Sequence, residues 1–259
     1  VGHMTKRVEA AFIIIGNEIL SGRTQDANLA WLAARLNGIG IAVAECRIIP
    51  DIETRIIDTV REMSERFDYV FTSGGIGPTH DDITAAAIAK AFDTVLERNA
   101  EAVSRLEVHY GDPAELTAPR LKMAEIPVGA TLIDNPVSAA PGFRIANVHV
   151  LAGVPKIFQA MIDGILPALT GGAPVISRTV VSDLPESAIA ELLGRIERAH
   201  NGVEVGSYPY FKLGQGGVSV VVRSTEQSAV DAAACAVFEG IEALGGKPAY
   251  LDPGLKQPA

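Results

Sequence analysis

TSGGIGPTHDDIT, residues 72–84, joins an apolar run to an alanine-rich run. The apolar residues 69–71 predict a buried strand, and residues 85–89 predict a helix. Three glycines let the backbone approach a ligand closely, and the first turn of a helix offers unpaired N–H groups to an anion. A strand, a glycine-rich turn and a helix in this order predict a phosphate-binding site.

Two adjacent carboxylates, Asp81 and Asp82, complicate this prediction. They would repel a phosphate unless they hold a cation, orient a hydroxyl or take part in acid–base chemistry. The turn has no lysine, so it is not a Walker loop, and His80 stands where a dinucleotide fingerprint has its third glycine. The pattern therefore favours a phosphorylated substrate handled with a metal; the alternative is a tight turn in which Asp81 caps the helix.

Composition limits the partners that the chain can have. Its 259 residues carry a net charge of −9, which argues against binding to nucleic acid. No apolar run is as long as a membrane span, so no membrane association is expected. Cys46 and Cys235 lack metal-ligand spacing and indicate a reducing, cytoplasmic setting. Residues 1–3 look like a cloning remnant before Met4.

The first half of the chain alternates strand and helix patterns. Strands are predicted at Val8–Ile15, Ile41–Ile49 and Tyr69–Thr72, and helices at Asp26–Leu36, Asp51–Arg66 and Asp82–Phe92. Repeated βαβ units predict a three-layer α/β fold with a mostly parallel sheet. Ligands bind such sheets at the carboxyl ends of the strands, where the turns at 16–18, at 50–51 and around Gly75 are expected to meet.

A fourth strand, Val148–Leu151, adds the glycine turn 153–155 to the same edge. The segment NPVSAAPGF, residues 135–143, is too rich in proline and small side chains for a regular element. It follows a helical stretch, Glu101–Ala124, that is interrupted near Gly111. Topology therefore predicts a binding role for the loops at 141–142 and 153–155.

Thr170–Pro174 has the composition of a linker between two domains, residues 4–170 and 175–252. The second domain has strand and helix patterns in the order β-α-β-β-α, which predicts a small α+β module. Its expected role is packing or dimerisation, with residues 206–210 considered as a lid.

Four segments together resemble a known family: GNEILSGRTQDANLAWLAARL (Gly16–Leu36), TSGGIGPTHDDIT, NPVSAAPGF and LAGVP. They are similar to the N-terminal domain of the CinA (competence/damage-inducible protein A) family, in the molybdopterin-binding superfamily. The resemblance covers residues 8–169, and the second module resembles the KH-like middle domain of longer members. Full-length relatives continue into an amidohydrolase domain that this sequence lacks, so deamidation is not implied.

The resemblance implies two activities. CinA-type domains resemble pyrophosphatases that split ADP-ribose with a divalent metal, and a related domain is fused to eukaryotic FAD synthase. The adenylyltransferase branch of the superfamily instead activates molybdopterin with ATP; Asp51 and Asp82 match its two aspartates. The GPTHDDIT form of the loop is that of the CinA group, which favours the pyrophosphatase. A third hypothesis is a non-catalytic module that binds a pterin or nucleotide.

The expected site combines these loops. Asp51, Asp81 and Asp82 are the expected catalytic residues, and it stays open whether Asp51 or Asp82 orients the attacking water. Asp81, Asp82 and Glu18 are expected to hold a divalent metal (Mg²⁺, Mn²⁺ or Co²⁺), and molybdopterin is a possible ligand. A small-molecule nucleotide or pterin substrate and a homo-oligomer, dimer or trimer, are the expected partners. The predicted ligand-binding residues are Gly16, Asn17, Glu18, Ser73, Gly74, Gly75, Gly77, Pro78, Thr79, His80, Ser138, Pro141, Gly142, Gly153 and Pro155.

Overall fold

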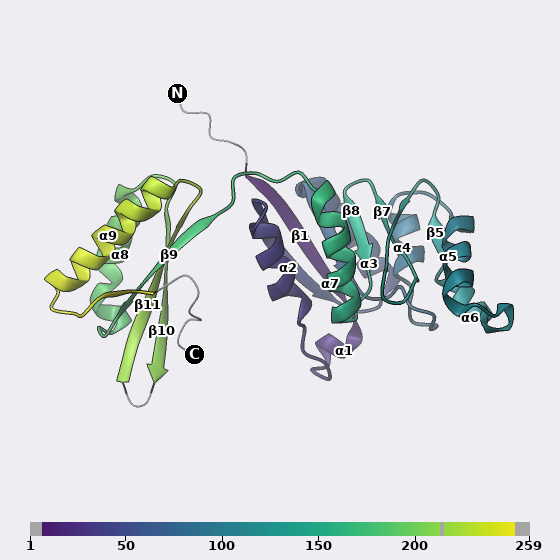
Figure 1. Ribbon diagram of the computed structural model, residues 1–259, viewed down its shortest axis with the longest axis horizontal. Coiled ribbons are helices and arrows are strands. Elements are labelled where there is room, and N and C mark those ends of the chain that lie inside the picture. The colour runs from purple at the N-terminus through teal and green to yellow at the C-terminus, as the bar shows by residue number, and fades with distance from the viewer. Residues whose placement is uncertain (1–6, 213–214, 252–259) are drawn as a thin grey trace, which may run out of the picture. The chain divides into compact units, whose positions relative to one another are not determined.

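A computed structural model describes residues 7–212 and 215–251 (Figure 1). The chain divides after Gly172 into two compact units, which are described separately. Within the described ranges, no helix combines the length and the apolar character needed to span a bilayer.

The first unit is built on a six-stranded sheet with the order β2-β1-β3-β8-β7-β6. Its strands β2, β1, β3 and β8 are parallel, β7 is antiparallel to β8, and β6 is antiparallel to β7. The mostly parallel sheet predicted from the sequence is therefore confirmed. The strands are β1 (Val8–Ile15), β2 (Ile41–Ile49), β3 (Tyr69–Ser73), β6 (Thr131–Ile133), β7 (Gly142–Ile145) and β8 (Val148–Leu151).

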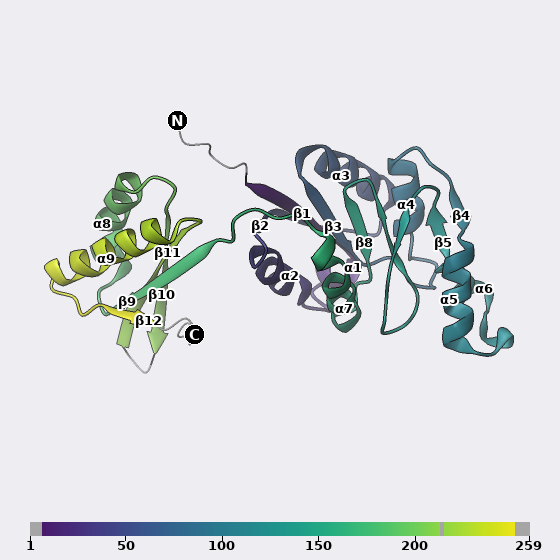
Figure 2. The ribbon, with the colours of Figure 1, turned by 45° about the horizontal axis from the view of Figure 1, so that its top comes forward.

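Helices cover both faces of this sheet, which gives the three predicted layers (Figure 2). One face packs against α2 (Asn28–Asn37) and α7 (Pro155–Ile165), and the other against α3 (Glu53–Arg66) and α4 (Thr84–Ala91).

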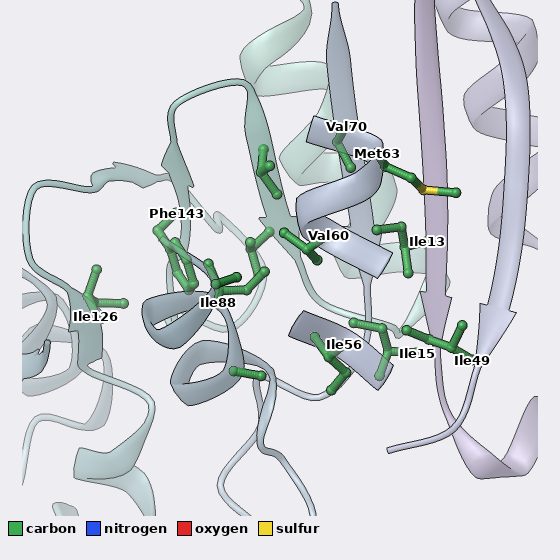
Figure 3. Packing of buried hydrophobic residues seen from close by; sticks show 14 of the residues in the cluster. Ile13, Ile15, Ile49, Ile56, Val60, Met63, Val70, Ile88, Ile126 and Phe143 are labelled. Carbon is green, nitrogen blue, oxygen red and sulfur yellow. The ribbon is translucent and has the colours of Figure 1, made fainter. Parts of the chain in front are cut away.

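Strand β1 is apolar apart from Glu9, and its residues 10–15 are buried on both faces of the sheet. Phe12 lies in the core under α2 and α7, whereas Ile13 and Ile15 lie in the core under α3 and α4. Figure 3 shows the core under α3 and α4, in which Ile56 and Val60 of α3 project toward the β1 side chains. Because successive side chains of β1 point to opposite faces of the sheet, this central strand packs against both helical layers.

An insertion between α4 and β6 contains the interrupted helical stretch. Asn99 caps α5 (Ala100–Tyr110) by accepting a 3.0 Å hydrogen bond from the amide of Ala102, and α5 ends at Gly111, where φ is +72°. A 3₁₀ turn (Pro113–Glu115) and α6 (Ala118–Lys122) follow. The sequence did not predict the short strands β4 (Leu96–Arg98) and β5 (Glu125–Pro127), which pair with each other, nor α1 (Asn17–Leu20), the 3₁₀ turn Leu166–Ala168 and β6.

Three predicted helix starts were wrong by one or two residues. Asp26 precedes α2 and accepts hydrogen bonds from the amides of Asn28 and Leu29. Asp51 does not cap α3, because its carboxylate binds the amide of Asn17. Asp81 does not cap α4, which begins at Thr84 without a side-chain cap.

The second unit is a four-stranded antiparallel sheet with the order β10-β11-β9-β12 and two helices on one face. The predicted β-α-β-β-α order is confirmed, and β12 is added; the arrangement is that of a split βαβ, ferredoxin-like unit. Residues 206–210 belong to β10 and pair with β11, so they do not form a free lid. Its elements are β9 (Ile176–Ser182), α8 (Glu186–Ala199), β10 (Glu204–Lys212), β11 (Gln215–Ser224), α9 (Gln227–Ala243) and β12 (Ala249–Leu251).

Candidate functional site

The loops after β1, β2, β3 and β8 meet at the carboxyl edge of the first sheet. The amide of Gly16 donates to the carbonyl of Ile49 at 3.1 Å, and the amide of Gly74 donates to the carbonyl of Leu151 at 3.1 Å. The amide of Asn17 donates a 2.9 Å hydrogen bond to Asp51 Oδ2. In this arrangement Asp51 holds the loop after β1 rather than the helix that follows it.

Gly74 and Gly75 make the turn after β3 with φ angles of +104° and +69°. A Cβ on Gly74 would lie 2.2 Å from the carbonyl oxygen of Ile15, so no larger residue fits. Thr84, the first residue of α4, fixes the turn: its hydroxyl donates to the carbonyl of Gly74 and its amide to that of Gly75, both at 3.0 Å. Thr84 was not among the predicted site residues, although a hydroxyl residue at a helix start is the type that makes such bonds.

Thr79 brings the two loop aspartates together. Its amide donates to Asp82 Oδ2 at 2.8 Å, and its hydroxyl oxygen contacts Asp82 Oδ2 and, at 2.5 Å, Asp81 Oδ1. The Thr79 hydroxyl is the first reason that the pKa of Asp81 lies below its usual range, followed by a backbone hydrogen bond and by the charges of His80 and Lys122.

The contacts of this hydroxyl bear on the expected metal. A hydroxyl has one hydrogen and can donate it to only one of two carboxylate oxygens. Mg²⁺ and Mn²⁺ prefer oxygen ligands. The oxygens of Thr79, Asp81 and Asp82 are the groups of this loop that could hold such a cation.

Glu18 does not belong to this group. In residues 7–212 and 215–251, no three His, Cys, Asp or Glu side chains lie close enough together to hold a metal by themselves. Glu18 is exposed at the start of α1 and lines a different pocket from that of Asp82.

An apolar pocket of 110 Å³ lies beside the glycine loop. Polar groups at its edge come from Asp82, Glu125 and Lys122, and the ammonium of Lys122 donates a hydrogen bond to the carbonyl of Thr79. Sequence reasoning missed Lys122, because nothing in the local pattern of α6 indicates that it reaches the glycine loop. The pocket is lined by Gly75, Ile76, Gly77, Asp82, Ile83, Ala85, Ala86, Leu96, Lys122, Met123, Glu125, Ile126, Pro141 and Phe143.

A smaller pocket lies beside β1 and the start of α2. It includes the predicted residues Glu18, Ser73, Gly153 and Pro155. Buried Asn28 also lines it: the side-chain amide donates to the carbonyl of Gly153 at 2.9 Å, and Oδ1 has no hydrogen-bond partner among the described residues. Gly153 packs closely on the glycine turn, since a Cβ there would lie 3.2 Å from the Cα of Gly74.

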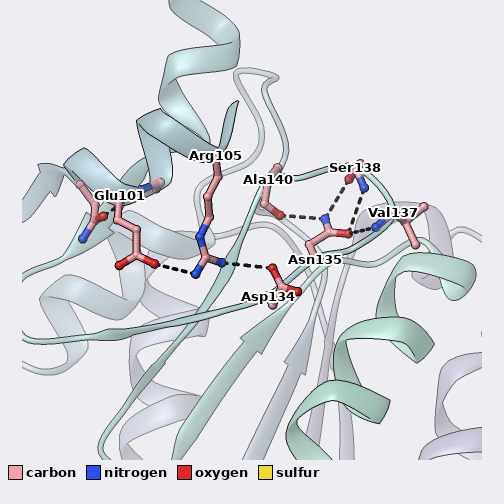
Figure 4. A network of polar contacts seen from close by, with 9 residues as sticks. Glu101, Arg105, Asp134, Asn135, Val137, Ser138 and Ala140 are labelled. Carbon is pink, nitrogen blue, oxygen red and sulfur yellow. Dashed lines mark hydrogen bonds and ion pairs between the residues drawn. The ribbon is translucent and has the colours of Figure 1, made fainter. Parts of the chain in front are cut away.

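The loop between β6 and β7 is held by the buried side chain of Asn135 (Figure 4). Its amide group donates to the Ser138 hydroxyl and the Ala140 carbonyl, both at 2.8 Å, and its oxygen accepts from the amides of Val137 and Ser138. Ser138 therefore has a structural partner within its own loop.

Because β7 is antiparallel to β8, its start lies at the same edge of the sheet as the end of β8. Pro141 consequently lines the apolar pocket. Gly142 is buried, and a Cβ there would lie 2.3 Å from the carbonyl oxygen of Val150, so β7 can pack at this distance from β8 only with a glycine at this position. Pro78 and His80 are exposed on the glycine loop.

Comparisons with known sequences agree with this geometry. Residues 11–171 match the family described as "Probable molybdopterin binding domain", and residues 174–244 match "FAD synthase, middle domain". A protein of Pyrobaculum arsenaticum is 38% identical over 212 residues, which cover 77% of this chain and 79% of that relative. A "Probable FAD synthase" of Caenorhabditis briggsae is 34% identical over 239 residues, covering 80% of this chain and 44% of that protein.

A solved structure is also similar over the first unit. CinA from Thermoplasma acidophilum is 36% identical with a TM-score of 0.59, covering 63% of this chain and 99% of that one. The sheet, the glycine turn and the sequence matches lead to one assignment: the chain belongs to the molybdopterin-binding domain family, as a CinA-like member whose residues 174–244 are similar to the middle domain of FAD synthase.

Proposed function

We propose that the chain is a metal-dependent nucleotide pyrophosphatase that acts on ADP-ribose or a related dinucleotide. The observation that carries the proposal is the meeting of the Thr79, Asp81 and Asp82 oxygens on a glycine loop that leads into α4. Backbone amides at a helix start suit phosphate, and oxygen ligands suit a hard cation, so one loop offers both. The likeness to an FAD synthase supports a substrate with an adenylated diphosphate.

In this proposal the amides of Gly75 and Gly77 bind the diphosphate. Thr79, Asp81 and Asp82 hold Mg²⁺, Mn²⁺ or Co²⁺, which when bound neutralises charge on the diphosphate oxygens. Water attacks the adenosine-linked phosphorus, the bond to the bridging oxygen breaks, and AMP and ribose 5-phosphate leave. Asp51 or Asp82 accepts the proton of the water; the bond from the Asn17 amide gives Asp51 a positioning role as well.

A second candidate is molybdopterin binding or adenylylation. The match of residues 11–171 to the molybdopterin-binding family favours it. Adenylylation would release pyrophosphate from ATP, whereas the pyrophosphatase would release AMP from a dinucleotide, so the products distinguish the two reactions.

A non-catalytic module that binds a nucleotide or pterin is the third candidate. It is favoured because the described residues hold no group of three metal-ligating His, Cys, Asp or Glu side chains. Such a module would retain a ligand but turn none over with any metal.

The test is a panel of ADP-ribose, FAD, NAD and ATP with molybdopterin, each incubated with Mg²⁺, Mn²⁺ or Co²⁺. Chromatography for AMP and an assay for pyrophosphate identify the products. AMP from ADP-ribose or FAD, reduced by at least about 100-fold in Asp82→Ala, is the expected result. Asp58→Ala, at an exposed position of α3, is the matched control. Full turnover by Asp82→Ala would contradict the assignment, and absence of product from every pair would favour the binding module.

A further inference from the structure

Lys122 ends α6 and is half-buried beside the glycine loop. Its ammonium donates a hydrogen bond to the main-chain carbonyl of Thr79. Thr79 is the residue that also holds Asp81 and Asp82. A side chain from the insertion is thereby fixed at the acidic end of the loop.

Lys122 is surrounded by more acidic than basic side chains in the apolar pocket. Among the described residues that line the apolar pocket, Lys122 is the one cationic side chain, and it shares the pocket with Asp82 and Glu125. Glu125 has another partner, the guanidinium of Arg98 at 3.9 Å. The positive charge that faces the glycine loop in this pocket thus comes from Lys122.

The carbonyl of Thr79 uses only one of the three N–H donors of the ammonium. A phosphate oxygen is a stronger partner than a carbonyl, because both partners of that bond are charged. The loop itself carries two carboxylates and no lysine, so a diphosphate bound there would meet net negative charge without Lys122.

We propose that Lys122 is the phosphate-binding cation of the glycine loop. When a nucleoside diphosphate group binds to the amides of Gly75 and Gly77, the ammonium bonds a non-bridging phosphate oxygen from the pocket side. Thr79, Asp81 and Asp82, next to Lys122 on the same loop, would hold the divalent cation. This inference rests on the proposed function for the class of ligand, a nucleoside diphosphate, but it does not require hydrolysis.

Three variants separate charge from hydrogen bonding. Lys122→Met removes both, Lys122→Gln keeps an N–H donor without charge, and Lys122→Arg keeps both. Lys247→Met, at an exposed position of the second unit, is the matched control. Circular dichroism and thermal unfolding establish that each variant is folded.

The first readout is the affinity for ADP, measured by calorimetry with and without Mg²⁺. We expect Lys122→Met and Lys122→Gln to weaken ADP binding by about 10- to 100-fold, and Lys122→Arg to stay within about threefold of the wild type. The Lys247→Met control should bind as the wild type does. The second readout is hydrolysis of ADP-ribose, for which Lys122→Met and Lys122→Gln should raise KM and lower kcat.

Wild-type ADP affinity in Lys122→Gln as well as in Lys122→Arg would overturn the proposal, because Lys122 would then only hold the Thr79 carbonyl. Wild-type affinity in Lys122→Met, or failure of the wild type to bind ADP, would overturn it too. If neither the wild type nor any variant hydrolyses ADP-ribose but ADP binding follows the charge at position 122, the proposed pyrophosphatase activity is wrong and the role of Lys122 stands. If Lys122→Met hydrolyses ADP-ribose as the wild type does, the pyrophosphatase stands and the role of Lys122 is wrong.

Discussion

The amide of Asn17 and the carboxylate of Asp51 are joined by a 2.9 Å hydrogen bond that links the loops after β1 and β2. An aspartate with this bond can position the edge of the site without exchanging a proton. Asp51→Asn keeps an oxygen acceptor, so it should retain most of the kcat for ADP-ribose. Asp51→Ala should lower the free energy of unfolding by about 1 to 2 kcal/mol. Steady-state kinetics and urea unfolding check both; a kcat loss of orders of magnitude in a stable Asp51→Asn would instead identify a general base.

Gly74 should tolerate no side chain. Its φ of +104° and the carbonyl of Ile15, 2.2 Å from the position of a Cβ, combine backbone strain with overlap. Gly74→Ala should therefore lose about 3 kcal/mol or more of unfolding free energy. Gly22 has a φ of +71°, and no atom of the described residues would lie within 4 Å of a Cβ there, so Gly22→Ala should lose only about 1 kcal/mol. Equal losses in the two variants, measured by urea unfolding, would contradict the close packing of the turn.

Buried His149 should make the protein sensitive to acid. Burial, and then the charge of Arg144, lower its pKa to about 4. Its ring stacks on that of Phe71 with 5.0 Å between the ring centroids, and within the part of the chain that the structure describes its Nδ1 has no hydrogen-bond partner. Between pH 6.5 and pH 4 the unfolded chain takes up a proton that the folded chain does not, so stability falls as the pH falls.

The loss attributable to this histidine between pH 7.5 and pH 5 is about 2 kcal/mol. His149→Phe should lose that much less than the wild type over the same range in urea unfolding. His109→Gln, at an exposed position, is the control and should follow the wild type. An unchanged pH profile in His149→Phe would show that the acid sensitivity lies elsewhere.

Replacement of Asn28 by aspartate, which has the same shape but carries a charge, should destabilise the protein. Its amide donates to the Gly153 carbonyl, and an aspartate there would place two acceptors against each other inside the protein. Asn28→Asp should lose about 2 kcal/mol or more of unfolding free energy at pH 7.5. Asn37→Asp, at the exposed end of α2, should change stability by only a few tenths of that amount. Similar results for the two positions would mean that the bond to Gly153 contributes little.

The sequence predicts a strand well when the strand is long enough for its pattern of apolar residues to show whether one face or both faces are buried. The sequence predicts Val8–Ile15 with its observed ends, because all residues but Glu9 are apolar, as in a strand buried on both faces. Strands β4, β5 and β6 have three residues each, too few to show a period, and they form through pairing with distant partners.

The candidate site, too, was predictable only in part. The strand order predicts that the loops meet at the carboxyl edge of the sheet, and that the loop with Pro141 lies there. Lys122 and Thr84 could not be placed, because their contacts depend on how helices fold back over the loop. Asp51 was predicted as a helix cap because a local partner is the simplest expectation, whereas the structure gives it a partner from another loop.

The order of strands in the first sheet has a kinetic consequence. Strand β3 pairs with β8, a strand that the chain reaches only after α4, α5, α6 and strands β4 to β7. The entropy of closing so long a loop must be overcome before this pairing stabilises anything. The glycine turn lies at the end of β3, and the amide of Gly74 donates to the carbonyl of Leu151 in β8, so this turn should be among the last parts of the first unit to form. Refolding followed at this edge should accordingly be slower than refolding followed at the adjacent β1–β2 pair.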